Sequence, residues 1–235
     1  MSSFTPFIFK HFFIRQQYAA FKIGTDSVLL GAWGQPQSDK PIVDIGCGTG
    51  ILTLMMAQRT QSALTAIDCD PLSLKDAAYN FEHSPWNHRI KMVRDDAKKW
   101  AKIQTREYGY MISNPPYFSQ SLRNSDIRKS KARHNDSLSN LDIIQIANNI
   151  LLPEGIIALI LPVDEMKIFM NDAYIHRMYP QRICFIKHTA NKNPKRCMAE
   201  FTLKKQKPEI STFTLFNNDQ TPTEAYLQLT KDFYL

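Results

Sequence analysis

The sequence contains no hydrophobic run long enough to cross a membrane. No window of its 235 residues approaches the ~18 uncharged apolar residues that a spanning helix needs. Residues 1–10 are rich in aromatic side chains but lack the basic start, apolar core and small-residue cleavage site of a signal peptide. These absences predict a cytoplasmic protein with no membrane partner.

Closely spaced cysteines are also absent. Cys47, Cys69, Cys184 and Cys197 lie far apart in the chain and form no C-x-x-C pair. Reduced thiols in a cytoplasmic protein are the simplest explanation, and neither a zinc site nor any other metal site is predicted.

Internal repeats and interdomain linkers are absent as well. The hydrophobic fraction of 43% and the aromatic fraction of 11% are typical of a folded globule with a substantial core. We therefore expect one domain over residues 1–235, with an N-terminal arm at 1–40, a core at 41–207 and a C-terminal strand and helix at 208–235. The net charge of +7 suits a polyanionic partner.

Strands and helices are predicted to alternate along most of the chain. This alternation indicates an α/β fold with a mostly parallel sheet, helices on both faces and ligands at the carboxyl ends of the strands. Strands are expected at residues 41–46, 63–67, 90–93, 108–112 and 156–162, and helices at 28–33, 51–59, 71–81, 97–104, 138–152 and 164–176. An antiparallel hairpin is expected from residues 181–187 and 199–204, followed by a strand at 212–216 and a helix at 223–229.

The sequence Asp44-Ile45-Gly46-Cys47-Gly48-Thr49-Gly50 connects the first of these strands to its helix. A strand, a glycine-rich turn and a helix N-terminus bind part of a nucleotide-like cofactor, because glycine lets the backbone approach the ligand closely. The Gly-x-Gly-x-Gly spacing departs from the Gly-x-Gly-x-x-Gly dinucleotide pattern. Asp44 would repel a pyrophosphate but suits a positively charged group. S-adenosylmethionine, which carries an ammonium, a sulfonium and no phosphate, is therefore the predicted cofactor.

Acidic residues follow the second and third strands. Asp68 lies 18 residues after Gly50, close to the spacing at which an acidic side chain meets ribose hydroxyls in this kind of fold. The alternative is a solvated carboxylate at a strand end. Asp95 and Asp96 follow the third strand; either can cap the next helix, and we favour Asp96 as a contact for the adenine amino group.

The residues Ile112-Ser113-Asn114-Pro115-Pro116-Tyr117 end the fourth strand. Each proline fixes its own φ and lacks an N–H donor, so hydrogen-bond acceptors are concentrated here beside one aromatic ring. An acceptor pair next to a stacking ring suits a flat substrate with an NH2 group, such as adenine. Taken alone, the segment is equally compatible with a proline-rich turn after a core strand.

Two basic segments are predicted to be loops. The first follows the proline pair and the second joins the strands of the hairpin. Both are compatible with solvated charged loops and with binding of RNA phosphates. The basic residues concerned are Arg123, Arg128, Lys129, Lys131 and Arg133 in the first loop, and Lys192, Lys195 and Arg196 in the second.

Together these motifs resemble the class I S-adenosylmethionine-dependent methyltransferases, over nearly the whole chain. The Asn-Pro-Pro-Tyr tetrad is the most specific part of the resemblance, and it implies methylation of a planar nitrogen. More narrowly, the chain resembles the bacterial tRNA adenine N6-methyltransferases that modify adenine 37 of a valine tRNA. The resemblance implies a Rossmann-like, mostly parallel sheet of seven strands with a C-terminal antiparallel hairpin.

The resemblance also assigns roles to residues. The catalytic residues would be Asn114, Pro115, Pro116 and Tyr117, with the Asn114 oxygen and the Pro115 carbonyl holding the amine. The helix start at Gly24-Thr25-Asp26, which by itself indicates only a cap, would contribute to the cofactor site. The full set expected at that site is Gly24, Thr25, Asp26, Asp44, Gly46, Cys47, Gly48, Gly50, Asp68, Asp96 and Asn114.

Three other functions are compatible with the sequence. Release-factor methyltransferases act on a protein glutamine with the same tetrad, although they carry an additional N-terminal helical domain. Ribosomal RNA or DNA adenine is an alternative acceptor, because no residue here reads sequence directly. A basic RNA-binding module without catalysis is the non-enzymatic alternative. The oligomeric state is not indicated.

Overall fold

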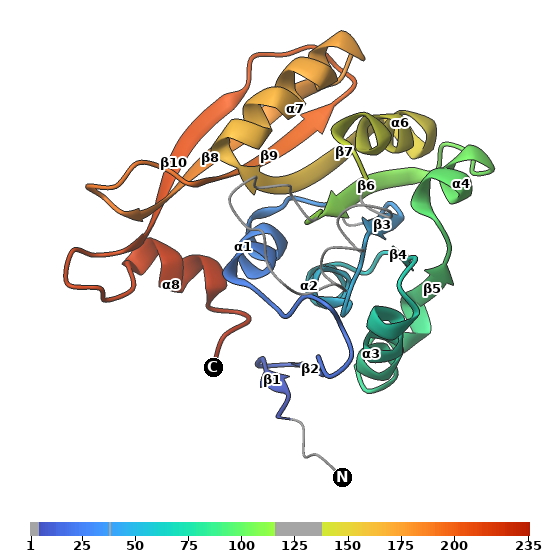
Figure 1. The fold of residues 1–235 in the computed structure, drawn as a ribbon, viewed down its shortest axis with the longest axis horizontal. Coiled ribbons are helices and arrows are strands. Elements are labelled where there is room, and N and C mark those ends of the chain that lie inside the picture. The colour runs from blue at the N-terminus through green and yellow to red at the C-terminus, as the bar shows by residue number, and fades with distance from the viewer. Residues whose placement is uncertain (1–4, 38, 116–137) are drawn as a thin grey trace.

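The computed structural model describes residues 5–37, 39–115 and 138–235 (Figure 1). Its centre is an eight-stranded sheet with the strand order β10-β8-β9-β7-β6-β3-β4-β5. A separate antiparallel pair near the N-terminus is formed by β1 (Phe7–Ile8) and β2 (Phe13–Ile14). The strands of the main sheet are β3 (Ile42–Ile45), β4 (Leu64–Asp68), β5 (Ile90–Arg94), β6 (Tyr108–Ser113), β7 (Leu151–Pro162), β8 (Tyr179–Thr189), β9 (Arg196–Thr202) and β10 (Glu209–Phe216).

The strand directions confirm the expected α/β fold. Every neighbouring pair in the main sheet is parallel except the two pairs that contain β9. The predicted hairpin is therefore present as β8 and β9. The predicted count of seven strands is wrong, because β10 extends the sheet and pairs in parallel with β8 from Glu209 opposite Arg182. The strand expected at 212–216 is thus part of β10, whose first four residues are exposed while Phe213 and Leu215 pack against the core.

Helices cover both faces of the main sheet (Figure 1). One face packs against α4 (Ala97–Lys102), α6 (Asn140–Ile150) and α7 (Val163–Ile175), which share a single buried cluster with the strands. The other face packs against α1 (Thr25–Trp33), α2 (Ile51–Arg59), α3 (Pro71–Glu82) and α8 (Glu224–Thr230), and the short helix η1 (Asn87–Arg89) precedes β5. None of the helices in the described ranges combines the length and apolarity needed to cross a membrane.

The strand β7 begins five residues before the expected position. Leu151 pairs with Tyr108, and the next pair joins Ile156 to Tyr110. The register therefore shifts by several residues on the β7 side, and residues 152–155 stand outside the ladder. From Ile156 onward β7 is the buried strand that its apolar sequence predicts.

The C-terminal segment, whose role the sequence does not indicate, packs against the N-terminal arm. The Lys10 backbone N–H donates to the Phe233 carbonyl (2.9 Å), and the Phe9 ring stacks on Tyr234 with centroids 6.0 Å apart. Phe233 is buried in the same cluster as Phe9 and Phe12. The two ends of the chain therefore stabilise one another on the α2 side of the sheet.

The arm continues towards α1 along the surface of α3, where Asp76 holds it. Arg15 Nε donates to Asp76 Oδ1 (2.8 Å), and the Tyr18 and Ala19 N–H groups donate to Asp76 Oδ2 at 2.7 and 2.9 Å. The Asp76 side chain is fully buried, so these three donors replace its water shell. The buried carboxylate thus fixes the path of the arm immediately before the Gly24-Thr25-Asp26 turn.

Replacing Asp76 with Ala should lower the free energy of unfolding by about 3 kcal/mol, because Arg15 and two partly buried N–H groups lose their acceptor. Asp164→Ala is the matched control, since Asp164 pairs with Lys167 at an exposed site and should change stability by less than about 0.5 kcal/mol. Urea unfolding of both variants measures the difference. Equal losses in the two variants would contradict a special role for Asp76.

Candidate active site

The glycine loop between β3 and α2 is tied to the end of β4. The Gly46 and Cys47 N–H groups both donate to the Ile67 carbonyl at 2.9 Å. Gly46 and Gly48 have φ of +73° and +54°, and a Cβ atom on either would have no neighbour within 4 Å. Among the described residues, the loop therefore presents backbone with no side chain against it, which is the geometry that close approach of a ligand requires.

Asp44 lies one residue before the end of β3 and is only 2% exposed. Its Oδ2 accepts hydrogen bonds from the Thr53 N–H (3.0 Å) and hydroxyl (2.7 Å). Its Oδ1 is buried and has no partner among the described residues. Burial raises the pKa of Asp44 to about 7, and the two bonds from Thr53 only partly offset that effect. An unpaired buried acceptor of this kind fits a cationic ligand group.

Asp68, the last residue of β4, is hydrogen-bonded to the glycine loop. Its Oδ2 accepts from the Gly48 N–H (2.8 Å) and its Oδ1 accepts from the Asp70 N–H (2.8 Å). Burial raises the pKa of Asp68, while these backbone N–H bonds lower it. Each carboxylate oxygen has a second lone pair, so these bonds leave acceptor capacity for ribose hydroxyls.

Asp96 caps the helix α4. Its Oδ1 accepts from the Lys98 and Lys99 N–H groups at 2.8 and 3.1 Å, while Asp95 Oδ1 accepts from the Asp96 N–H (2.7 Å). The alternative recognised in the sequence, a helix cap, is therefore present. Contact of Asp96 with a cofactor remains a prediction.

Asn114 and Pro115 follow β6 directly, next to the glycine loop. The Ser113 hydroxyl donates to the Ile45 carbonyl (2.7 Å), which joins the end of β6 to the end of β3. The Asn114 side-chain Nδ2 donates to Ser27 Oγ in the first turn of α1 (2.9 Å). Asn114 is half-buried and Pro115 is buried. Pro116 and Tyr117 lie outside the described residues.

The first turn of α1 is also joined to β9. Asp26 Oδ2 accepts from Arg196 Nε at 2.8 Å, and both side chains are partly exposed. Gly24 precedes the helix with an extended backbone and no side-chain cap is present. The predicted cofactor turn at Gly24-Thr25-Asp26 thus meets one of the residues predicted to bind RNA.

Sequence reasoning missed three polar residues that fix this region. Asn80 on α3 donates from Nδ2 to the Thr49 carbonyl and to the Arg15 carbonyl, both at 2.9 Å, and so joins the glycine loop to the arm. Thr53 donates to Asp44, and Ser27 accepts from Asn114. Only Thr53 had a visible signal, as a polar residue in an otherwise apolar helical run.

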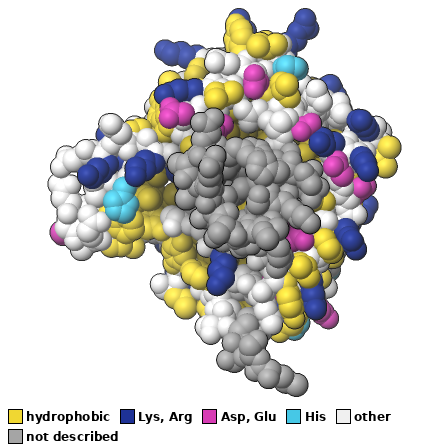
Figure 2. All heavy atoms as spheres, viewed as in Figure 1, with side chains coloured by type: hydrophobic (Ala, Val, Ile, Leu, Met, Phe, Trp, Pro, Cys, Tyr) yellow, Lys and Arg dark blue, Asp and Glu magenta, His cyan; other side chains and the backbone are white. Residues whose placement is uncertain are grey.

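The predicted basic residues are only partly described. Lys192 and Lys195 are exposed in the connection between β8 and β9, and Arg196 is half-buried in its ion pair with Asp26. Lys, Arg and His side chains lie on the lobe at the left of Figure 2, where this connection is found. Arg123, Arg128, Lys129, Lys131 and Arg133 lie outside the described residues.

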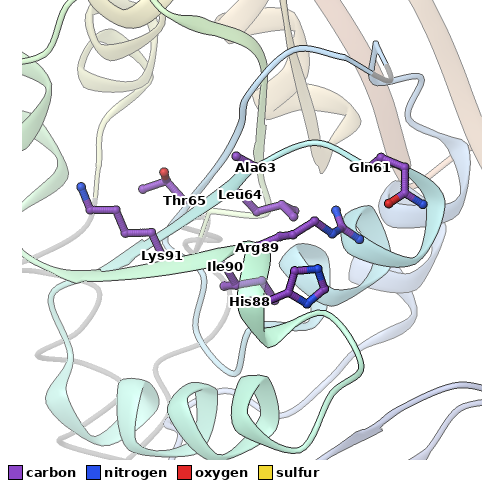
Figure 3. Close-up of a pocket in the computed structure, with 8 residues that line it drawn as sticks. All are labelled: Gln61, Ala63, Leu64, Thr65, His88, Arg89, Ile90 and Lys91. Carbon is purple, nitrogen blue, oxygen red and sulfur yellow. The ribbon is translucent and has the colours of Figure 1, made fainter.

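A cavity of about 430 Å³ lies at the opposite edge of the sheet, at the amino ends of β4 and β5 (Figure 3). Arg89 donates to the Ser62 and Ala57 carbonyls at 2.7 and 2.9 Å, so its guanidinium N–H groups are bonded to the protein's own backbone. Figure 3 shows Lys91 extending away from the Arg89 guanidinium, and the two cations therefore do not converge. In the described residues, no group of three or more His, Cys, Asp or Glu side chains is placed to hold a metal ion.

The parallel α/β sheet, with a glycine loop after β3 and acidic residues at the ends of the next two strands, is a Rossmann-like fold, and the comparisons with known proteins identify it as a methyltransferase. The fold agrees with that of a predicted O-methyltransferase from Agrobacterium tumefaciens, at a TM-score of 0.69 and 17% identity over 88% of this chain and 96% of that one. The Methyltransferase small domain family matches residues 18–161.

Curated relatives match almost the full length. A tRNA1(Val) (adenine(37)-N6)-methyltransferase from Bacteroides fragilis is 36% identical over 97% of both chains. One of the same name from Photobacterium profundum is 35% identical over 97% of this chain and 98% of its own. The chain therefore belongs to the Methyltransferase small domain family, and within it to the group that contains these relatives.

Gly50, the last glycine of the loop, tests the geometry of the site. It has φ of +83°, and an added Cβ would lie 2.3 Å from the Phe81 ring. Gly50→Ala should therefore lower the free energy of unfolding by about 3 kcal/mol, through backbone strain and overpacking together. Gly48→Ala, with strain but no clash, should lower it by about 1–2 kcal/mol.

Urea unfolding of both variants gives the comparison. Phe81→Leu should cost less in the Gly50→Ala background than in the wild type, because it removes the clashing ring edge. Independent, additive losses would show that the ring does not restrict Gly50.

Proposed function

We propose that this protein transfers a methyl group from S-adenosylmethionine to N6 of an adenine in RNA, namely adenine 37 in the anticodon loop of a valine tRNA. The observation that carries the proposal is the position of Asn114, which lies at the end of β6 beside the glycine loop with its amide held by Ser27. The names of the curated relatives support the choice of tRNA. The reaction would take place in the cytoplasm, in one domain over residues 1–235.

The residues around the glycine loop fit S-adenosylmethionine. Asp44, with its buried unpaired oxygen, would hold the cationic end, and Gly46 and Gly48 would lie against the ligand. Asp68 would accept from the ribose hydroxyls and Asp96 would border the adenine. The bound cofactor supplies an electrophilic methyl group on sulfur. The proposed set also includes Gly24, Thr25, Asp26, Cys47, Gly50 and Asn114.

Asn114 and Pro115 would activate the acceptor nitrogen. The lone pair of an adenine amine is delocalised into the ring, so the amine is a poor nucleophile. The Asn114 side-chain oxygen and the Pro115 carbonyl would accept its two N–H bonds and bind the nitrogen more strongly as it becomes cationic. Tyr117 would stack on the base, a contact worth about 1–3 kcal/mol. The proton then leaves the product ammonium to water, so no general base is needed.

RNA would approach the edge of the sheet at which these residues lie. The β8–β9 connection lies at this edge, beside the carboxyl end of β7. Its Lys192 and Lys195 are exposed. Phosphate contacts of this kind orient an RNA without reading its sequence. Arg196 and the basic residues between 123 and 133 complete the proposed contact set. An anticodon loop presents its bases at lower cost than a duplex.

Cofactor affinity should depend on the ionisation of Asp44. Its pKa of about 7 means that the carboxyl is largely neutral in the free protein at lower pH. A cation binds the ionised form, so the affinity for S-adenosylmethionine should rise about tenfold per pH unit up to about pH 7 and then level off. Calorimetric titration from about pH 5.5 to about pH 8 measures this, with proton release on binding at the acidic end.

Asp44→Asn is the matched control, because it keeps the shape and removes the charge. Its affinity should be weaker and flat across the same range. A pH dependence that persists in Asp44→Asn would assign the titration to another group.

The acceptor is tested by methyl transfer from labelled S-adenosylmethionine to separate pools of tRNA, ribosomal RNA and protein. The tRNA should come from cells that lack this enzyme, so that the site is unmodified. We expect N6-methyladenosine in tRNA, and a loss in kcat of at least about a hundredfold in Asn114→Ala. Cofactor affinity should stay nearly intact, because Asn114 is one of eleven residues in the proposed cofactor set. Asn148→Ala is the control, since Asn148 bonds to the His176 carbonyl on the α6–α7 side of the sheet.

Two results would contradict the proposal. Label confined to the protein pool would indicate a glutamine methyltransferase. Near-normal turnover in Asn114→Ala would show that the amide does not bind the reacting nitrogen.

A further inference from the structure

Ser27 is the only described residue whose side chain bonds to the Asn114 amide. The Ser27 Oγ accepts from Asn114 Nδ2 at 2.9 Å, and Ser27 is 9% exposed. Within the described part of the chain, Asn114 Oδ1 accepts no hydrogen bond. The nitrogen of the amide is therefore held by the protein, while its oxygen has no partner among the described residues.

This division matters because the two ends of an amide have opposite hydrogen-bonding character. The NH2 group only donates and the oxygen only accepts. A rotation of the amide by half a turn would place donors where the acceptor is needed, and they would repel the N–H bonds of a substrate amine. In the structure the Ser27 hydroxyl accepts from Nδ2, and in this arrangement Oδ1 points away from α1.

The position of Ser27 is itself fixed. It lies in the first turn of α1, followed by Val28, Leu29 and Leu30, which are at most 1% exposed. The preceding residue, Asp26, is joined to Arg196 on β9 by the 2.8 Å ion pair. Apolar packing and the ion pair therefore both hold the turn against the sheet. Together they keep Ser27 next to Asn114.

We propose that Ser27 is a positioning residue, which holds the Asn114 amide so that its oxygen faces the acceptor nitrogen. This inference rests on the proposed function, in which the acceptor nitrogen is the adenine amine. Two other roles make different predictions. A hydroxyl that merely satisfies the helix start would leave kcat unchanged when removed, and a cofactor ligand would weaken cofactor binding.

The kinetic test compares Ser27→Ala with the wild-type protein. We expect kcat to fall by about tenfold to a hundredfold, because a misplaced reacting group loses a large part of its effective concentration. The Kd for S-adenosylmethionine and the KM for tRNA should stay within about twofold, since Ser27 belongs to neither the proposed cofactor set nor the proposed RNA contact set. Ser27→Thr keeps the hydroxyl and should recover most of the rate.

Ser62→Ala is the matched control. Ser62 is also buried, and its hydroxyl donates to the Gln37 carbonyl (3.5 Å) at the amino edge of the sheet. Its kcat should stay at the wild-type level. A kcat for Ser27→Ala within about twofold of wild type would overturn the proposal, as would a parallel loss of cofactor affinity. A loss that Ser27→Thr does not recover would assign the effect to packing and would also overturn it.

A second measurement reads the orientation without any substrate. The side-chain NH2 resonances of Asn114, identified by their absence in Asn114→Ala, should exchange slowly with solvent in the wild type. In Ser27→Ala they should exchange at the rate of an exposed asparagine, and in Ser62→Ala they should be unchanged. Equal exchange in wild type and Ser27→Ala would refute the hold on the amide. If the wild-type protein methylates no RNA, the proposed function fails, and this measurement still decides whether Ser27 orients Asn114.

Discussion

Four adjacent strands, β5, β4, β3 and β6, run in the same direction, and the whole candidate site depends on that constraint. Parallel strands end at a common edge, so residues that are distant in the chain meet there without any bending of the backbone. Asp44, Asp68, Asp96 and Asn114 each reach this edge from a different strand. Reversal of any one of them would carry its side chain to the opposite end of the sheet.

Strand ends alone do not define a site, because the loops that follow them need fixed paths. In this protein buried polar side chains provide that fixation. Asp68 binds the Gly48 N–H, Asn80 binds the Thr49 carbonyl, and Asp76 binds the arm that leads to α1. Each of these groups is satisfied by backbone donors or acceptors, which is the condition under which burial of polar groups is tolerated. Among the described residues, two buried side-chain oxygens have no partner, Asp44 Oδ1 and Gln58 Oε1. Asp44 Oδ1 lies at the strand ends, where a ligand is expected.

The parts of the fold that follow from local pattern were predictable. The strand–glycine–helix sequence at residues 42–59 and the alternation through β6 are present as expected, because hydrophobic periodicity and turn residues act within a few positions. The role of Asp76 and Asn80 was not predictable, since their partners in the arm lie about 60 residues away in sequence. The place of β10 in the main sheet was missed for the same reason: a strand was expected at 212–216, but its pairing with β8 is set by tertiary packing. Asp96 shows a third case, in which one residue type suits both a helix cap and a ligand contact.

The single reversed strand, β9, has a consequence for how the site meets the outside. Because β9 runs against its neighbours, its first residue rather than its last lies beside the end of β7, with Arg196 opposite Pro162. The turn of a hairpin is thereby brought to the rim at which the parallel strands end. Such a turn is anchored at both of its ends by the same ladder, so its length and charge can change without disturbing the sheet. The fold therefore separates the buried ends of the parallel strands from an exposed, basic turn at the same rim.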